Sequence, residues 1–111
     1  MTFIFGPLWS GKRAVAQKLL GCDEAELSRR CVWDVQKLVR ETKDLEKLAT
    51  ELSAFDIVIA TEVGGGIIPS DSGERGEREQ AGLLNILLAK RAETVIRVFC
   101  GIPMILKGEE K

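Results

Sequence analysis

The chain has 111 residues, of which 45% are hydrophobic and 30% charged, and its formal net charge at pH 7 is -1. This length predicts a single globular domain over residues 1–111 and excludes a largely disordered chain. Sixteen Lys and Arg against 17 Asp and Glu leave no positive excess, which disfavours nucleic-acid binding. No segment approaches the ~20 apolar residues that span a bilayer, so we expect no membrane partner.

The cysteine and histidine content limits both the cellular compartment we expect and the reactions that the protein could catalyse. The three cysteines stand at no metal-ligand spacing, and their odd number predicts free thiols in a reducing, cytoplasmic setting. A secretory signal is not expected, because no basic segment precedes the short N-terminal apolar run. The chain contains no histidine, which excludes histidine bases, ligands and covalent intermediates from its mechanism.

The first predicted element is a short buried strand at residues 2–5, followed by a loop from Gly6 to Gly11. A helix is predicted from there to Leu20, with Gly21 as its C-cap. A GxxxxGK loop between strand and helix is typical of a phosphate-binding P-loop, in which main-chain amides and Lys12 would hold the β- and γ-phosphates. The alternative is a glycine-rich turn with a surface lysine.

The loop departs from the usual motif at position 13, where Arg stands in place of the Ser or Thr that ligates Mg²⁺. A guanidinium cannot ligate a metal ion, so either another residue holds it or Arg13 takes over charge neutralisation. Trp9 and Trp33 are candidates to cover a ring ligand or to pack in the core. The predicted nucleotide-binding residues are Gly6, Trp9, Ser10, Gly11, Lys12 and Arg13.

The middle of the chain is less regular. Residues 23–29 predict a short helical turn and residues 31–35 a brief strand. Leucines at three- and four-residue intervals predict one or two amphipathic helices over residues 36–52. Asp34 and Asp56 are weaker metal-ligand candidates, and Asp56 stands at the start of the next strand, away from the ligand-binding edge.

A continuous apolar run at residues 55–60 predicts a strand covered on both faces. Glu62 follows it, where a carboxylate could hold a metal ion or orient a hydroxyl, so Lys12 and Glu62 are the predicted catalytic pair. The alternative for Glu62 is a capping or salt-bridged surface acid. Gly64 and Gly65 would bring amides close to a ligand or form a flexible turn.

A long helix is predicted after Pro69, reaching about Ala92. On it Arg75 and Arg78 would clamp substrate or phosphate, unless they pair with neighbouring acids. Residues 94–100 predict a third clear strand that Gly101 and Pro103 close. Strands alternating with helices predict an α/β fold with a mainly parallel sheet of three or four strands.

These motifs resemble the adenosylcobinamide kinase/adenosylcobinamide-phosphate guanylyltransferase family of corrinoid biosynthesis. The resemblance is carried by FIFGPLWSGKR, DIVIATEVGGGIIP, Arg75, Arg78, Ala81-Gly82, Leu84-Asn85, Leu88-Ala89 and the run from Val95 through GIPMILK. It implies a three-layer P-loop (RecA-like) fold, GTP or ATP with Mg²⁺ as cofactors, a corrinoid substrate and a homo-oligomer.

The chain also departs from this family. Members are longer and carry, between the loop and the EVG segment, a histidine that accepts GMP and a strand that ends in Asp. Here the middle is shortened to about residues 22–54, and Thr61 stands where the family has Asn. The resemblance therefore implies a kinase without guanylyl transfer. A non-catalytic nucleotide- or corrinoid-binding module and a P-loop protein acting on another alcohol are the alternatives.

Overall fold

The computed structural model describes residues 1–62 and 72–108, with side chains left out for residues 72–75. Within these residues one sheet has the strand order β2–β3–β1–β4–β5. The strands are β1 Thr2–Gly6, β2 Cys31–Val32, β3 Ile57–Thr61, β4 Thr94–Phe99 and β5 Ile102–Lys107. The helices are α1 Lys12–Leu20, α2 Glu24–Arg30, the 3-10 helix η1 Val35–Arg40, α3 Leu45–Leu52 and α4 Ser72–Arg91. The first four strands are parallel, and β5 runs antiparallel to β4.

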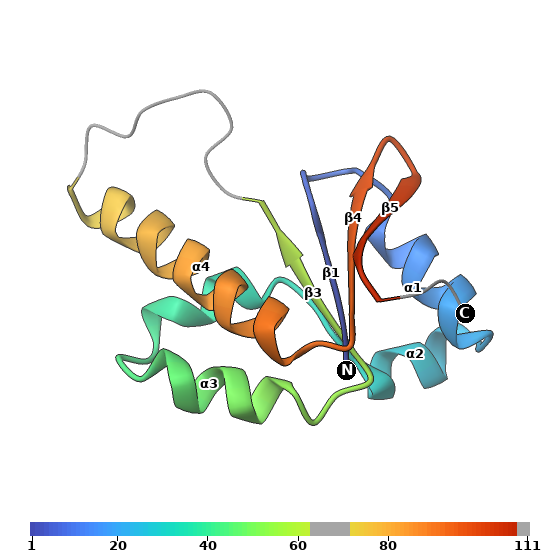
Figure 1. The fold of residues 1–111 in the computed structure, drawn as a ribbon, viewed down its shortest axis with the longest axis horizontal. Coiled ribbons are helices and arrows are strands. Elements are labelled where there is room, and N and C mark those ends of the chain that lie inside the picture. Colours follow the sequence, from blue (N-terminus) through green and yellow to red (C-terminus); the bar gives the residue numbers. More distant parts are fainter. Residues whose placement is uncertain (63–71, 109–111) are drawn as a thin grey trace.

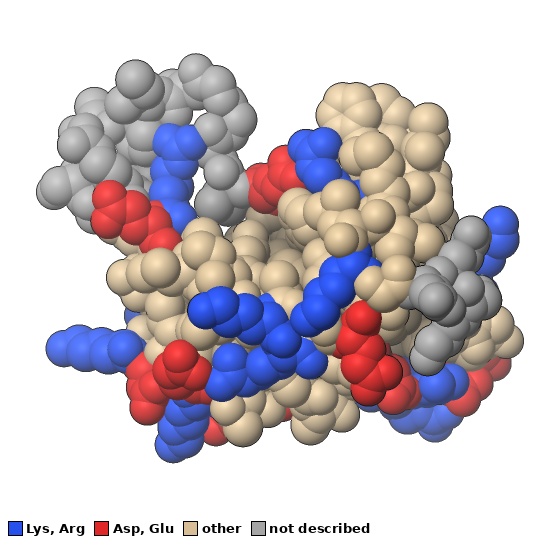
Figure 2. All heavy atoms as spheres, viewed as in Figure 1, with Lys and Arg blue, Asp and Glu red and all other residues tan. Residues whose placement is uncertain are grey.

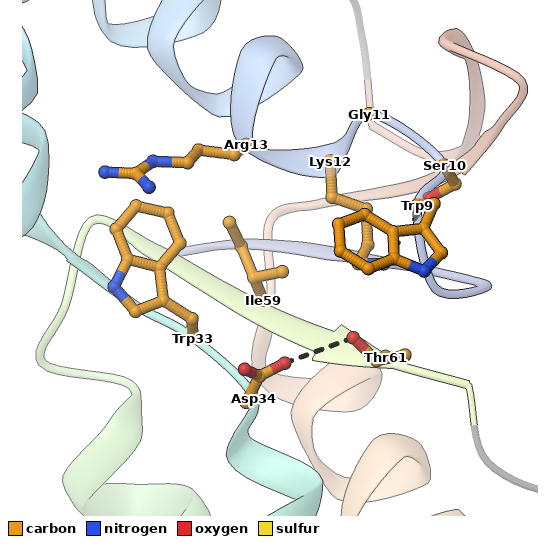
Figure 3. Close-up of a pocket in the computed structure, with 9 residues that line it drawn as sticks. All are labelled: Trp9, Ser10, Gly11, Lys12, Arg13, Trp33, Asp34, Ile59 and Thr61. Atoms are coloured by element: carbon orange, nitrogen blue, oxygen red, sulfur yellow. Dashed lines mark hydrogen bonds between the residues drawn. The ribbon is translucent and has the colours of Figure 1, made fainter.

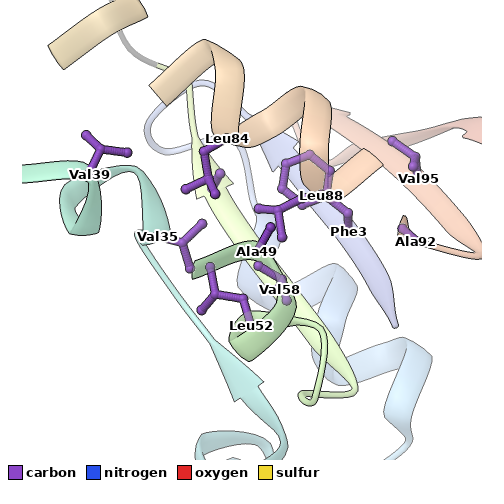
Figure 4. Packing of buried hydrophobic residues seen from close by; sticks show 11 residues of the cluster. Phe3, Val35, Val39, Ala49, Leu52, Val58, Leu84, Leu88, Ala92 and Val95 are labelled. Carbon is purple, nitrogen blue, oxygen red and sulfur yellow. The ribbon is translucent and has the colours of Figure 1, made fainter. Parts of the chain in front are cut away.

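The sheet separates two buried apolar layers because successive strand residues point to opposite faces. Phe3 and Val58 pack beneath α4 with Leu84 and Leu88 (Figure 4). The neighbouring residue Ile4 packs on the other face, where α1 and α2 lie (Figure 1). The α/β class, the three layers and the mainly parallel sheet are therefore as predicted.

The strand count was predicted wrongly, because β5 was not expected. Gly101 and Pro103 indicated the end of a strand, whereas the chain reverses through Cys100 and Gly101 and returns as β5. Both turn residues have positive φ, 51° and 74°, as in the two-residue turn that matches the twist of a hairpin. Pro103 is tolerated because β5 is an edge strand, where a missing N–H need not break a ladder.

The middle of the chain keeps the predicted elements with shifted bounds. Strand β2 ends at Val32 rather than Val35, because Asp34 takes a left-handed conformation with φ of 52°. The amphipathic segment divides into η1 and α3. Asp23 and Asp44 cap α2 and α3 by accepting hydrogen bonds from main-chain amides.

Charged side chains are unevenly distributed over the surface. Charged side chains of both signs cover much of the lower part of the view in Figure 2, whereas the β4–β5 hairpin carries mostly uncharged atoms. All six residues of β5 are exposed. Among the described residues no helix combines the length and apolarity that a membrane span requires. The cytoplasmic location stays a prediction.

Candidate functional site

The loop between β1 and α1 has glycine where its neighbours leave no room for a side chain. A Cβ on Gly6 would clash with the carbonyl oxygen of Val98. Gly11 has φ of 91°, and a Cβ there would lie 3.2 Å from the Cα of Gly101. The first and last glycines of the motif are thus both required by contacts with β4 and the hairpin turn.

Main-chain amides at the end of this loop are available to an anion. In residues 1–62 and 72–108, no main-chain carbonyl accepts a hydrogen bond from the amides of residues 10–13. The first helical bond joins the Val15 amide to the Gly11 carbonyl, and the Gly101 amide donates to the Ser10 carbonyl at 2.7 Å. The Gly101 contact fixes the loop, while the amides of residues 10–13 have no main-chain acceptor among the described residues. An anion site at a helix N-terminus requires such amides.

The side chain of Lys12 is buried in the loop rather than extended into solvent. Its Nζ donates to the carbonyls of Gly6 at 3.2 Å and Pro7 at 2.7 Å, and lies 3.4 Å from Ser10 Oγ. Burial lowers the pKa of Lys12, and the charges of Asp34 and Glu62 oppose that shift. A phosphate would have to replace some of these loop acceptors to bind the ammonium.

A cavity of about 440 Å³ opens beside the loop, at the carboxyl ends of β2 and β3 (Figure 3). Its polar groups include Asp34 and Thr61, whose hydroxyl lies 3.2 Å from Asp34 Oδ1. The Thr61 amide donates to Gln36 Oε1. The cavity is lined by Trp9, Ser10, Gly11, Lys12, Arg13, Trp33, Asp34, Ile59 and Thr61. Asp34, the weaker metal-ligand candidate of the sequence analysis, lies at this edge because it follows a short strand that ends there. Its role as a metal ligand stays a prediction.

Arg13 points away from Lys12 and extends over Trp33 (Figure 3). Its Cζ lies 5.0 Å from the centre of the Trp33 ring, and its Nη2 lies 3.7 Å from Oε1 of Glu24. The charge that would oppose a metal ion is therefore drawn toward an indole and a carboxylate outside the loop.

Glu62 lies at the predicted edge of the sheet, but another side chain engages it. Arg97 of β4 reaches both carboxylate oxygens, with Nε to Oε1 at 2.8 Å and Nη2 to Oε2 at 3.2 Å. This hydrogen bonding raises the pKa of Arg97. The pair bridges across the end of β1, because β1 lies between β3 and β4. A role for Glu62 as metal ligand stays a prediction.

The other predicted residues are placed as follows. Gly64, Gly65 and the side chain of Arg75 lie outside the described residues. Arg78 is half-buried on α4, and its role as a phosphate clamp stays a prediction. Asp56 pairs with Arg30 at the opposite end of β3, as its position predicts.

Sequence comparisons extend these observations to known proteins. The sequence model of the family described as "Cobinamide kinase / cobinamide phosphate guanyltransferase" matches residues 22–106. A similar curated protein, the "Bifunctional adenosylcobalamin biosynthesis protein CobP" of Pseudomonas aeruginosa, is 36% identical over 76 residues. That alignment covers 68% of this chain and 44% of the relative, so the chain spans less than half of the relative's length. The family match begins after the loop, which makes the loop geometry a separate observation.

Proposed function

Because this chain belongs to the cobinamide kinase / cobinamide phosphate guanyltransferase family, we propose that it transfers a phosphoryl group from ATP or GTP to a corrinoid side-chain hydroxyl. The observation that carries the proposal is the loop of residues 6–13, whose last amides are available beside Lys12 and the cavity. Phosphoryl transfer depends mainly on positioning and charge stabilisation, which these groups provide. The chain has no histidine to carry GMP, so guanylyl transfer is not part of the proposal.

The roles in the loop follow from its contacts. The amides of residues 10–13 would bind phosphate oxygens, and Lys12 would exchange loop carbonyls for the β- and γ-phosphates. Gly6 and Gly11 allow the loop to approach β4 and the hairpin turn. Trp9 would lie beside the bound nucleotide at the cavity.

The oxygen atoms of Asp34 and Thr61 in the cavity are better ligands for a magnesium ion than the guanidinium of Arg13. The described residues contain no group of three or more Asp, Glu or Cys that could hold a metal without other ligands. Mg²⁺ needs only one or two protein oxygens together with phosphates and water. Asp34 and Thr61 would supply them, with Glu62 as a second candidate if Arg97 releases it. When bound, the ion would draw charge from the phosphate oxygens.

Binding measurements test the phosphate site. We expect ATP or GTP to bind with magnesium dependence and Lys12→Ala to weaken binding at least tenfold, because a charge-assisted contact is lost. Lys18→Ala, which changes an exposed lysine in the last turn of the same helix, is the matched control. Equal affinities for Lys12→Ala and the unaltered chain would refute the proposed cradle.

A second function is favoured by one observation. The bidentate Arg97 contact leaves Glu62 engaged, which suits a module that binds nucleotide or corrinoid without reacting. Incubating the protein with cobinamide, Mg²⁺ and either nucleotide, followed by mass spectrometry, separates the two. Cobinamide phosphate in amounts that exceed the enzyme supports the kinase. Nucleotide binding without product supports the module.

We also propose that the chain forms the homo-oligomer implied by its resemblance to the family. Large apolar side chains are exposed on the hairpin and could be covered by a second copy: Phe99, Ile102, Met104, Ile105 and Leu106. A stable interface covers about 800 Å² on each partner, which a hairpin of this size can contribute to. Light scattering of the purified chain tests this, and a monomeric mass would contradict it.

A further inference from the structure

Resting on the proposed nucleotide binding, we infer that the cavity contains a ring-binding subsite formed by Trp33 and Trp9, and that this subsite takes the nucleobase. The two indoles come from different elements. Trp33 follows β2, whereas Trp9 belongs to the loop before α1, and both line the cavity that Lys12 also lines. Figure 3 places them on opposite sides of the cavity, with Ile59 between them.

Trp33 has the properties of a fixed stacking surface. Cζ of Arg13 lies 5.0 Å from the centre of its ring, and Nη2 of Arg13 lies 3.7 Å from Oε1 of Glu24. Contact with a cation restrains an indole in one orientation. Trp33 is only half-buried, so part of its ring is left to the cavity. Arg13, which cannot serve as a metal ligand, thus acquires a role in orienting this indole.

Trp9 is held in a position that packing within the chain does not explain. Its φ is 62°, a conformation that is rare for bulky residues, and 92% of its surface is exposed. Ser10 is tied to the hairpin turn through the Gly101 amide, which restrains the loop immediately after the indole. A strained backbone that exposes a large apolar ring at a cavity indicates a ligand contact. A planar ring is the kind of ligand that stacks on such an indole face.

The cavity has suitable dimensions and polarity for a nucleotide. Its volume of about 440 Å³ lies within the range of ~300–1,000 Å³ for small-molecule sites. The buried side chain of Ile59 contributes an apolar surface between the indoles, while Asp34 and Thr61 contribute oxygens. A phosphorylated ligand with a planar ring can therefore contact Lys12 and Trp33 together.

Ligands that contain only the aromatic ring or only the phosphates test the subsite. ATP and GTP have both parts, inorganic tripolyphosphate has no ring, and adenosine and guanosine have no phosphate. The chain has two tryptophans, so Trp9→Phe leaves Trp33 as the sole indole fluorophore. We expect a nucleotide to quench that fluorescence through stacking. Tripolyphosphate should bind, measured by calorimetry, without quenching.

Substitution of Trp33 gives the affinity test. Trp33→Leu should weaken ATP or GTP binding by about five- to hundredfold, the range for loss of one stacked base, and leave tripolyphosphate binding unchanged. Trp33→Tyr, which keeps a ring, should retain most of the nucleotide affinity. Phe55→Leu is the matched control, because Phe55 is half-buried like Trp33 but precedes β3, at the opposite end of the sheet, and does not line the cavity. Circular dichroism melting checks that each variant folds.

The outcomes separate the two proposals. If tripolyphosphate binds but Trp33→Leu changes nucleotide affinity no more than Phe55→Leu does, the ring subsite is refuted and the phosphate site stands. Equal weakening of nucleotide and tripolyphosphate also refutes the subsite, because the effect is then not on the ring. If tripolyphosphate fails to bind the unaltered chain, the proposed function itself is wrong. Quenching by cobinamide but not by a nucleotide would reject the nucleobase as occupant.

Discussion

The two sides of the loop at residues 6–13 differ in how their acids are engaged. On the β2–β3 side, Asp34 lines a cavity. Its Oδ1 meets the Thr61 hydroxyl at 3.2 Å, and its Oδ2 lies at the longer distance of 3.9 Å from Nζ of the exposed Lys37. On the β4–β5 side, both oxygens of Glu62 are held by Arg97, and the hairpin turn lies against the loop. Both acids lie at the ligand-binding edge of one sheet. Position at this edge selects the candidate acids, whereas partners on neighbouring strands determine which oxygens of each carboxylate are already engaged.

The largest expected effect tests the packed side of the loop. Gly6→Ala should lower the free energy of unfolding by about 3 kcal/mol or more, because its Cβ would meet the rigid main chain of Val98 rather than a movable side chain. Thermal or urea unfolding measures this. Gly21→Ala is the control, since its φ of 61° is strained but nothing lies within 4 Å of the added Cβ. Similar losses in both variants would contradict close packing on this side.

Replacing each acid with its amide tests the comparison directly. Asp34→Asn should lower magnesium-dependent phosphoryl transfer by about 100-fold or more, because a metal contributes several kcal/mol of charge stabilisation. Glu62→Gln should have a smaller effect, since its carboxylate is engaged by Arg97. Steady-state rates over a range of Mg²⁺ concentrations measure both. A larger loss in Glu62→Gln would reverse the assignment and return Glu62 to the predicted metal site.

Removing Arg97 should leave the Glu62 carboxylate without its arginine partner, so that the two acids beside the loop become more alike. Arg97→Met releases the Glu62 carboxylate, while the free energy of unfolding should change little, because both side chains of the pair are about one-third exposed and water screens the interaction. Urea unfolding measures the stability, and the magnesium dependence of nucleotide binding reports whether Glu62 becomes a ligand. Arg30→Met, which breaks the exposed pair with Asp56 at the far end of β3, is the control.

The smallest expected effect is a pH dependence that belongs to Lys12. Burial lowers its folded-state pKa below the ordinary 10.5, so in the window between those two values the unfolded chain binds more protons. Stability should therefore rise with pH through that window, and tripolyphosphate affinity should fall as the ammonium is lost. Lys12→Met should remove both slopes. Calorimetry and unfolding at a series of pH values measure them, and unchanged slopes would assign them to other groups.

Sequence patterns predicted the parts of the fold that depend on neighbouring residues. The apolar run at residues 55–60, the C-cap at Gly21, and the loop between strand and helix each carry a local physical signal. Strand β5 was not predicted because Gly101 and Pro103 are equally compatible with the end of a strand and with a hairpin turn between two strands. Only the positive φ of Cys100, which sequence does not display, decides between the two.

The candidate site was less predictable because its contacts depend on strand order. Arg97 lies 35 residues after Glu62, and their contact requires β4 to lie beside β1 rather than at the sheet edge. The stacking of Arg13 on Trp33 likewise needs α1 and the end of β2 to meet on one face. Residue type and spacing selected the candidate positions, and sheet topology assigned their partners.

The hydrogen bonds of Lys12 have a consequence for how a ligand is received. Three acceptors within the loop already surround the ammonium, so phosphate arrival exchanges one set of oxygens for another. Under the proposed function, the loop would be a preorganised receptor, and binding of phosphate would cost little conformational entropy. Because the amides of residues 10–13 meet no main-chain acceptor within the described residues, their hydrogen exchange should be fast before nucleotide is added and slow markedly on binding, whereas the Val15 amide, already bonded to Gly11, should change little.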